Sequence, residues 1–386
     1  MARRSIPFRR RPRWPRWLLL WVILGGAVWW AWHAWLKPIP PATPGKPAIR
    51  PAPPIQPPVV VTPAPKTNRP AAAPPETNVP APAPLRPLPP PTFHPKPETP
   101  TAGQPATNLL VAQIALAAQG ISCGSLDGVG GAQTAAALRA FQMQHGLEQT
   151  GWLDRDTRRE LTTDRAPLIT YIITAAELAR LAPLPTTWLA KSQAAELDYE
   201  TVLELVAEQS HAHPNLIRRL NPSVNWDAVS AGTELVVPHA AYPPARRANL
   251  VRVSLGQHWI RAFDSQGNLL AHFPCSIGRI AEKRPVGELH VAVAVKNPNY
   301  TFDPAVFPES AEAREIGRKL VVPPGPNNPV GVAWIGLDRP GYGIHGTPGP
   351  EQVGRTESHG CFRLANWNAE YLRQMVGVGT PVWIEP

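Results

Sequence analysis

The sequence predicts a multidomain chain, in which a small α-helical bundle is followed by an α/β segment and then by a mostly-β domain. Apolar residues recur with the helical period of 3.6 between residues 106 and 163, and helix and strand patterns mix between residues 165 and 245. The period changes to two beyond residue 248. The chain has 386 residues, enough for two or three domains, but 51 of them are proline. Part of the chain therefore cannot pack into a core.

The positive charge lies in the N-terminal part of the chain. Residues 1–16 carry seven arginines and no acidic side chain, and residues 17–100 carry seven basic side chains against two glutamates. Residues 101–386 carry 24 basic and 26 acidic side chains, so the formal net charge of +10 does not describe them. Binding along nucleic-acid phosphates needs a basic surface. We therefore predict no nucleic-acid partner.

A basic arm, residues 1–16, precedes the apolar run WLLLWVILGGAVWWAWHAWL at residues 17–36. At about 1.5 Å per residue this run spans roughly 30 Å, the thickness of a bilayer core. The arginines before it predict a cytoplasmic N-terminus. A cleaved signal peptide has the same order, but the run is long and rich in Trp, and no small-x-small site precedes Lys37. Nor do the neighbours of the paired arginines support a twin-arginine export signal.

These features predict an uncleaved single-pass anchor in a bacterial cytoplasmic membrane, with the remaining chain in the periplasm or cell wall. Residues 37–105 then form a Pro-rich linker, with 26 prolines between Pro38 and Pro105. A polyproline II chain of this length extends over about 200 Å at ~3.1 Å per residue. The alternative is a ligand for proline-recognition domains, but its length and low complexity favour a spacer that holds the folded part away from the membrane.

Residues 106–163 have the pattern of a three-helix bundle. LLVAQIALAAQG ends at Gly120 as a helix does, TAAALRAFQMQHG is amphipathic, and Asp154 is an N-cap for the third helix. The run LDGVGGAQTAAALRAFQMQHGL with TGWLDRDTRREL resembles the peptidoglycan-binding module of wall enzymes, which implies binding of wall glycan or peptide. Asp127, Phe141 and Gln142 carry part of this match. Both a structural and a ligand-binding role remain open for them.

Residues 165–245 predict helices at residues 201–210 and 214–220 and a strand at 234–237. This part resembles the end of a LysM domain, in which a helix runs into L-N-P and the last strand is G-x-x-L-x-V-P; the resemblance implies glycan binding. The usual opening strand with its G-D-T signature is absent, and AAELDYET stands in its place. His211 and His213 have no Cys or carboxylate at ligand spacing, so we interpret them as a solvated helix end and predict no metal.

Residues 248–386 predict a mostly-β domain. Strand patterns cover residues 250–255, 259–263, 269–278, 288–296, 330–337 and 381–386. Asp264–Asn268 is typical of a hairpin turn, and one helix is expected from Asn366 to Gly377. About 135 residues are enough for a separate core.

The residues that suggest chemistry are YGIHGT at 342–347 and SHGCFR at 358–363. Three cysteines are an odd number, so in an oxidising compartment at least one thiol has no intramolecular partner. Cys361 stands among glycines and polar residues. A thiol attacks as thiolate and needs a base or cation to lower its pKa. His345, 16 positions earlier, can return beside it across two strands, and Gly360 lets the backbone approach a substrate oxygen.

These two motifs closely resemble the signature of the L,D-transpeptidase (YkuD-like) catalytic domain. The resemblance covers roughly residues 248–386 and implies Cys361 as nucleophile and His345 as its base. The carbonyl of Gly346 would hold the imidazole, as the third member of other triads does. RPVGELHV resembles the family's T-P-x-G-x-F segment, with Arg284 where Thr is usual. This departure leaves the role of that turn open.

The resemblance also implies an oxyanion site lined by His359, Gly360 and Cys361, with Ser358 supporting the loop. Arg363 would fix the loop or bind a substrate carboxylate with its bidentate guanidinium. The implied substrate-binding residues are therefore Arg363, Tyr342 and Thr347. No cofactor is implied.

The family implies acyl transfer in two steps, with peptidoglycan as partner. Cys361 would form a thioester at the third residue, a diamino acid, of a tetrapeptide stem and release D-Ala. An amine of a second stem then gives a 3-3 cross-link, a protein amine gives wall attachment, and water gives L,D-carboxypeptidase activity. A Cys peptidase of the NlpC/P60 type is disfavoured because its Cys precedes its His.

A non-catalytic wall-binding tether is the alternative from another class, and an intact His345 and Cys361 argue against it. The sequence leaves open the acceptor, the diamino acid and the oligomeric state. It also leaves open whether Cys123 and Cys275 form a disulfide. Without one, Cys275 is expected to face the core of its domain.

Overall fold

The computed structural model describes residues 103–307, 309–356 and 360–386. The predicted basic arm, transmembrane anchor and most of the linker lie outside the described residues, as do Ser358 and His359. No helix of the described part is long and apolar enough to cross a membrane. The described residues all belong to one compact unit that begins at Pro84.

The helical bundle forms as the period of its apolar residues predicts. Its helices are α2 (Leu109–Ala117), α3 (Ala132–Gln144) and α4 (Arg155–Glu160). Asp154 caps α4 by accepting a hydrogen bond from the Thr157 N–H at 2.9 Å, as predicted. A two-stranded antiparallel sheet, β1 (Gln104–Pro105) with β2 (Thr162–Thr163), closes the bundle. The last two residues of the predicted linker therefore belong to the bundle.

Residues 165–245 contain two strands and two principal helices. The predicted elements are found as α7 (Val202–Gln209), α8 (Pro214–Leu220) and β4 (Glu234–Pro238). An opening strand is also present, contrary to the prediction: β3 (Leu168–Ile172) pairs antiparallel with β4. It was missed because it precedes AAELDYET by more than twenty residues, in which the short helices α5 (Ala175–Leu178) and α6 (Trp188–Gln193) intervene.

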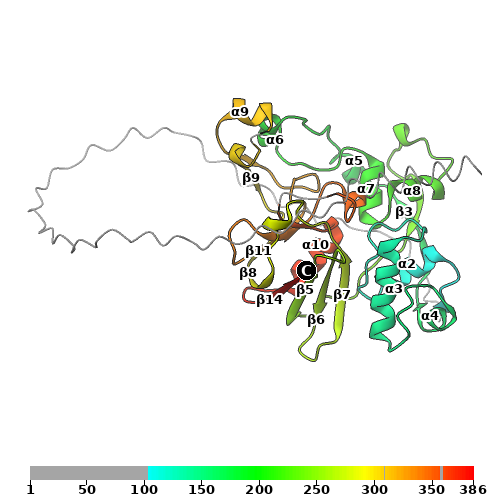
Figure 1. Cartoon of the computed structure of the whole chain (residues 1–386). Coiled ribbons are helices and arrows are strands. Elements are labelled where there is room, and N and C mark those ends of the chain that lie inside the picture. Colours follow the sequence, from blue (N-terminus) through cyan, green and yellow to red (C-terminus); the bar gives the residue numbers. More distant parts are fainter. Residues whose placement is uncertain (1–102, 308, 357–359) are drawn as a thin grey trace, which may run out of the picture. The chain divides into compact units, whose positions relative to one another are not determined.

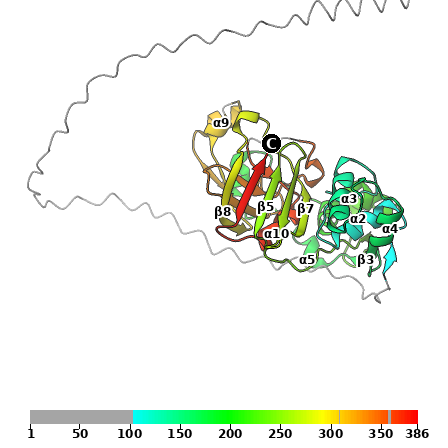
Figure 2. The same cartoon turned by 60° about the horizontal axis from the view of Figure 1, so that its bottom comes forward.

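The mostly-β domain is built on one eight-stranded sheet with the order β13-β12-β11-β8-β14-β5-β6-β7. The β14–β5 and β12–β13 pairs are parallel and the others antiparallel. Figure 2 shows β8, β14, β5 and β7 in this order. The strands are β5 (Leu250–Ser254), β6 (Trp259–Phe263), β7 (Leu269–Pro274), β8 (Gly287–Lys296), β11 (Ala333–Leu337), β12 (Gly343–His345), β13 (Phe362–Arg363) and β14 (Pro381–Glu385).

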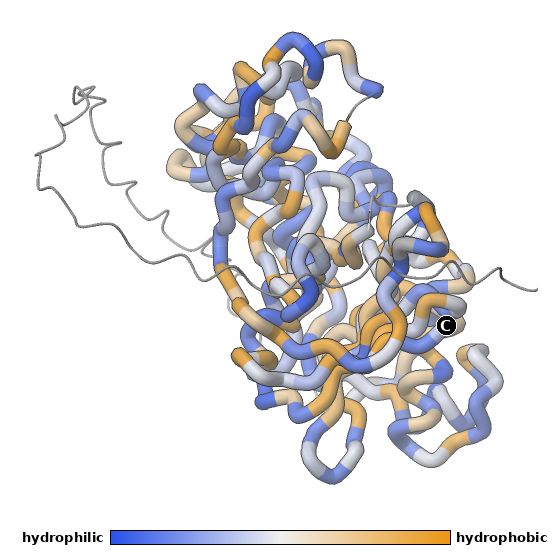
Figure 3. The backbone as a smooth tube through the Cα atoms, turned by 60° about the vertical axis from the view of Figure 1, so that its left-hand side comes forward, coloured by the Kyte–Doolittle hydropathy of each residue, from blue (hydrophilic) through white to orange (hydrophobic). Residues whose placement is uncertain are grey.

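The core of this domain lies between the sheet and α10 (Asn366–Met375), the one helix that was predicted here. Leu372 and Met375 of α10 are buried with Val291, Ile335 and Ile344 of three strands. The Asp264–Asn268 hairpin is also confirmed, since the Asp264 N–H donates to the Asn268 carbonyl at 3.0 Å. Figure 3 shows hydrophobic and hydrophilic residues mixed along the described part of the chain.

The segment between β8 and β11 has elements that the sequence did not predict. They are β9 (Tyr300–Phe302), α9 (Ala311–Ile316) and β10 (Leu320–Val322), with β9 and β10 paired antiparallel. Their small core also takes in Leu197 and Trp188 from the 165–245 segment. Short 3-10 turns lie at Trp226–Ala228, Ala281–Lys283, Pro304–Val306 and Pro350–Gln352.

The helical bundle contacts the β7 edge of the sheet through α3, which lies beside β7 in Figure 1. Ile121 and His272 form a parallel bridge in which the Ser122 N–H donates to the His272 carbonyl at 2.8 Å. Cys123 and Cys275 are buried near this junction, and both are free thiols. Cys275 lies in the core of the mostly-β domain, as expected for the unbridged case.

Candidate active site

The pairing of β12 with β13 brings the two sequence motifs together. In this parallel pair Ile344 lies opposite Phe362 and His345 opposite Arg363. Continuing the register backwards places Cys361 beside Gly343. Because side chains alternate between the faces of a strand, His345, Cys361 and Arg363 share one face. All three line the same cleft, whose volume is about 730 Å³.

His345 is arranged as a general base. Its imidazole is buried, and Nδ1 lies 2.6 Å from the carbonyl oxygen of Gly346, the contact that the family resemblance implies. A carbonyl only accepts, so Nδ1 carries the proton and Nε2 has the free lone pair. Burial lowers the pKa of His345 to about 4, with a smaller contribution from the charge of Arg363 and against the opposing effect of the Gly346 hydrogen bond. The imidazole is therefore neutral at neutral pH.

Trp334 supports this imidazole from the neighbouring strand. It pairs with His345 in the β11–β12 register, and the two rings stack with their centroids 5.6 Å apart. Gly343 leaves room for this ring, because a Cβ there would lie 2.6 Å from the indole. Trp334 lines the cleft as well. The sequence predicted the strand that carries Trp334, but only the strand order shows its neighbour.

Cys361 stands at the start of β13 and is partly exposed. Its Sγ lies 3.5 Å from the Gly341 carbonyl oxygen, to which it donates a hydrogen bond. Burial raises the pKa of the Cys361 thiol, while a hydrogen bond with the Gly343 backbone and the charge of Arg363 lower it. The sequence-based expectation of a lowered thiol pKa is therefore wrong for the resting site, because burial outweighs both neighbours. Thiol and imidazole are neutral until Cys361 passes its proton to His345.

Residues 276–284 contact both Gly360, directly before Cys361, and Arg363 of β13. Ser276 and Arg363 exchange two backbone hydrogen bonds of 2.9 Å. Gly278 packs on Gly360, and a Cβ on Gly278 would lie only 3.0 Å from the Gly360 Cα. Arg284, at the position where the family has Thr, donates from Nε to the Gly278 carbonyl at 2.6 Å. It therefore fixes the backbone against which Gly360 packs.

The other predicted site residues lie in different surroundings. Gly360 and Arg363 line the cleft, whereas Thr347 is buried and donates its backbone N–H to the Asn366 side chain at 3.0 Å. The Tyr342 ring lies 4.8 Å from the Arg339 guanidinium and packs against the domain core. As far as the described residues show it, the cleft lining does not include Thr347 or Tyr342. Their substrate contacts stay predictions, as do the roles of Ser358 and His359.

Aromatic side chains form the far wall of the cleft. Trp188, Tyr300 and Phe307 line it together with Val306. Trp188 stacks on Phe302 with centroids 4.3 Å apart and lies 5.9 Å from both Tyr300 and Phe307. Trp188 belongs to α6, about sixty residues before the predicted catalytic domain. No local sequence signal assigned it to this site.

The two histidines that were considered as metal ligands, His211 and His213, contact other groups of the fold. His211 is only partly exposed and stacks on Trp367 with centroids 5.1 Å apart, so its interpretation as a solvated helix end is wrong. His213 caps α8 by accepting the Asn215 N–H at 3.0 Å. The described residues contain no cluster of three His, Cys, Asp or Glu side chains that would hold a metal. The absence of a metal stays a prediction.

In the helical bundle, three residues whose roles the sequence left undecided make contacts within the fold. Gln142 is fully buried and donates to the Thr150 and Thr157 hydroxyls at 2.9 Å. Phe141 is buried in the bundle core, and Asp127 accepts the Val129 N–H at 2.8 Å. These contacts give all three residues a role in the fold, and a role in ligand binding stays a prediction.

A thiol and a neutral imidazole in one cleft, with a guanidinium beside them, are the groups of a thiol-dependent acyltransferase. Residues 248–384 match the L,D-transpeptidase catalytic domain (YkuD), and residues 106–161 match a peptidoglycan binding domain. The chain therefore has a region that matches the L,D-transpeptidase catalytic domain, and this region follows one that matches a peptidoglycan binding domain.

Relatives and solved structures have the same family name. The chain is 28% identical over 187 residues to the protein named as L,D-transpeptidase YkuD of Bacillus licheniformis, covering 48% of this chain and 93% of that one. It is 29% identical to the L,D-transpeptidase YbiS of Escherichia coli over 47% of this chain and 58% of that one. An L,D-transpeptidase structure from Xylanimonas cellulosilytica is 16% identical, covers 75% of this chain and 99% of that one, and has a TM-score of 0.31.

Proposed function

We propose that this protein is a membrane-anchored L,D-transpeptidase that forms 3-3 cross-links in peptidoglycan or attaches a protein to it. The observation that carries the proposal is the cleft in which Cys361, His345 and Arg363 lie on one face of β12 and β13. The family and the peptidoglycan-binding domain support peptidoglycan as the partner.

Acylation begins with a neutral Cys361 thiol and a neutral His345 imidazole. The Cys361 sulfur attacks the carbonyl carbon of the third stem residue while its proton passes to Nε2 of His345. The Gly346 carbonyl stabilises the resulting imidazolium through Nδ1–H. The backbone around Gly360 would stabilise the oxyanion. The carbon–nitrogen bond then breaks, and the imidazolium returns the proton to the amine of the departing D-Ala, which leaves a thioester.

Deacylation reverses these roles. A neutral amine of the acceptor attacks the thioester, its proton passes to His345, and the sulfur leaves and recovers a proton as thiol. An amide and an intact enzyme result. Arg363 lies beside the reacting groups and is suited to a substrate carboxylate, because a guanidinium forms two parallel hydrogen bonds with it.

The remaining segments would hold the enzyme in the wall. We propose that residues 165–245 are a LysM-like domain that binds glycan; the paired β3 and β4 with α7 and α8 support this, although the G-D-T signature is absent. The apolar run at residues 17–36 and the Pro-rich linker would place the enzyme in the periplasm or cell wall at a distance from the cytoplasmic membrane.

The test is product analysis by mass spectrometry. The full chain is incubated with disaccharide-tetrapeptides whose third residue is varied. We expect loss of D-Ala with a cross-linked dimer, and no product from Cys361→Ala. A hydrolysed tripeptide without dimer would favour the carboxypeptidase. Unchanged substrate, or equal product from Cys361→Ala, would favour the non-catalytic tether and exclude the enzyme.

A second measurement isolates the first step. A carbapenem resembles an acyl donor that is not released, and one relative's structure is described as a complex with imipenem. We expect a mass adduct on Cys361 that is absent from Cys361→Ser. An adduct on both proteins would place the reactive group elsewhere.

A further inference from the structure

The turn that follows His345 is held by one buried amide. The Oδ1 of Asn366 accepts the Thr347 N–H at 3.0 Å and the Val332 N–H at 3.3 Å. Gly346 packs so closely on this oxygen that a Cβ there would lie 2.2 Å from it. Gly346 also supplies the carbonyl that fixes the His345 imidazole. The position of the Asn366 oxygen therefore sets the position of the group that orients the base.

The other end of the same amide contacts a carboxyl group from outside the catalytic domain. Nδ2 of Asn366 lies 3.1 and 3.0 Å from the two carboxyl oxygens of Glu208, and 3.1 Å from the Pro326 carbonyl. Glu208 belongs to α7 in the 165–245 segment. Because its carboxyl group faces the nitrogen, it selects the orientation in which the oxygen of Asn366 points at the turn after His345.

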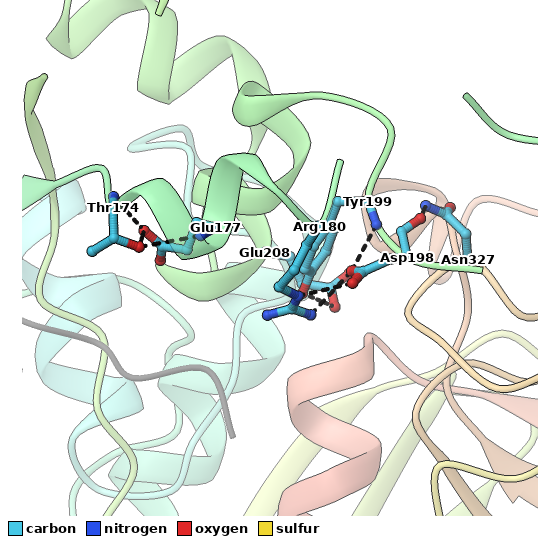
Figure 4. A network of polar contacts seen from close by, with 7 residues as sticks. All are labelled: Thr174, Glu177, Arg180, Asp198, Tyr199, Glu208 and Asn327. Carbon is cyan, nitrogen blue, oxygen red and sulfur yellow. Dashed lines mark hydrogen bonds and ion pairs between the residues drawn. The ribbon is translucent and has the colours of Figure 1, made fainter. Parts of the chain in front are cut away.

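Glu208 is itself held in place. The Tyr199 hydroxyl donates to its Oε1 at 3.1 Å. Arg180 is bound to Asp198 by two hydrogen bonds of 2.8 and 3.0 Å and also lies 5.6 Å from the Tyr199 ring. Figure 4 shows these four side chains together. A cavity of about 230 Å³ adjoins Glu208 and Asn366.

Burial also changes the ionisation of Glu208. Burial raises its pKa to about 8, against the opposing hydrogen bonds from Asn366 and Tyr199, and with a further contribution from Glu204 and Asp198. Lys296 and Glu370 are the other charged groups that line the cavity with Arg180. Gln has nearly the same shape as this carboxyl group and keeps one oxygen that can accept the Asn366 N–H.

We propose that Glu208 is a positioning residue for the transpeptidase reaction, which acts through Asn366 on Gly346 and so on His345. The inference rests on the proposed function of the cleft. It makes the 165–245 segment part of the active enzyme, because the catalytic domain alone does not supply this carboxyl group.

Variants of Glu208 test the series of contacts that runs from Glu208 through Asn366 to the turn after His345. Glu208→Asp withdraws the carboxyl group by one methylene with the smallest change in volume, and Glu208→Ala removes it. Glu208→Gln keeps the shape and one accepting oxygen. The control is Asn327→Ala, which removes side-chain hydrogen bonds to the Asp198 carbonyl and Glu204 at the same boundary without touching Asn366.

The readouts are kcat and KM for the tetrapeptide donor, the rate of carbapenem acylation, and the unfolding midpoint of the full chain. We expect Glu208→Asp and Glu208→Ala to lower kcat and the acylation rate by about 10–100-fold, because small misplacements of a base have effects of this size. KM should change less than about twofold. Glu208→Gln should recover most of kcat, and Asn327→Ala should keep kcat whatever it does to the unfolding midpoint.

The inference is overturned if Glu208→Asp and Glu208→Ala have the wild-type kcat, or if Asn327→Ala lowers kcat as much as they do. The second result would mean that any damage to this boundary has the same effect. Failure of the proposed function looks different, because the wild-type chain itself would then form no product. If Glu208→Ala does not fold, the kcat values of Glu208→Asp and Glu208→Gln test the inference.

Discussion

The reactive thiol in the cleft and the two thiols near the bundle junction differ in what surrounds their sulfur atoms. Cys275 and Cys123 are buried, and burial raises the pKa of both with no opposing neighbour; Asp127 raises that of Cys123 further. Burial also raises the pKa of Cys361, but the Gly343 backbone and Arg363 oppose it there. Exposure to the cleft, a backbone donor and a cation on the same strand therefore distinguish a nucleophile from two core side chains.

The strongest test of this comparison is to remove each thiol. We expect Cys361→Ala to lose at least about 10³-fold in cross-linking rate, because removal of a nucleophile leaves only binding and oxyanion stabilisation. Cys123→Ala should keep the wild-type rate and lose about 1 kcal/mol of unfolding free energy through a small cavity. Donor turnover and urea unfolding measure the two effects. Equal rates for both variants would contradict the comparison.

The pH dependence of alkylation tests the effect of the neighbours. Because the Cys361 pKa is raised above its ordinary value of 9.0, the thiolate fraction and the iodoacetamide rate should rise about tenfold per pH unit from pH 7 to 9. Arg363→Gln removes the cation, raises the thiol pKa further and should slow alkylation at each pH. Peptide mapping should find Cys123 and Cys275 unlabelled. A rate that is constant above pH 7 would instead indicate a resting thiolate.

The effect of burial on pKa, compared above for the three thiols, also applies to the carboxyl group of Glu208. Its pKa is raised to about 8, so its contribution to stability is full below pH 4.5 and is lost as the pH rises through about 8. The unfolding free energy of the wild type should fall relative to Glu208→Gln by a few kcal/mol between pH 5 and 9. Urea unfolding at three pH values measures this. Glu234→Gln, at an exposed carboxylate on β4, should show no such trend.

The smallest effect is expected at the far wall of the cleft. Trp188→Ala removes an aromatic contact with Phe302 and opens one side of the cleft. An aromatic pair contributes about 0.5–1.5 kcal/mol beyond its buried area, so KM for the donor should rise about 2–10-fold with little change in carbapenem acylation at saturation. Leu189→Ala, an exposed neighbour on α6, is the matched control. An unchanged KM would show that α6 does not bind the donor.

The sequence predicted the elements whose signals are local. The helices of the bundle, α7, α8 and α10, and the strands with period two all appeared close to their expected positions. What it missed depends on contacts between distant segments. β3 has no signal of its own beyond five alternating residues and is defined by its pairing with β4. β12 and β13 are three and two residues long, too short for a periodic pattern.

The same division applies to the site. Cys361, His345, Gly346 and Arg363 stood in two motifs, and a motif records the chemistry that a reaction needs at fixed spacings. Trp334, Trp188 and Glu208 stood in ordinary helices and strands. Their importance arises from the strand order and from the packing of the 165–245 segment on the catalytic domain.

The sequence by itself determined most of the local helices and strands and singled out the proposed nucleophile and base, because periodicity and motif chemistry are properties of short segments. Only the tertiary structure decided the protonation of the resting pair, since burial of Cys361 and His345 sets their pKa values. It also decided which remote residues complete the cleft. Desolvation and packing depend on atoms from all parts of the fold, and no local window of the sequence contains them.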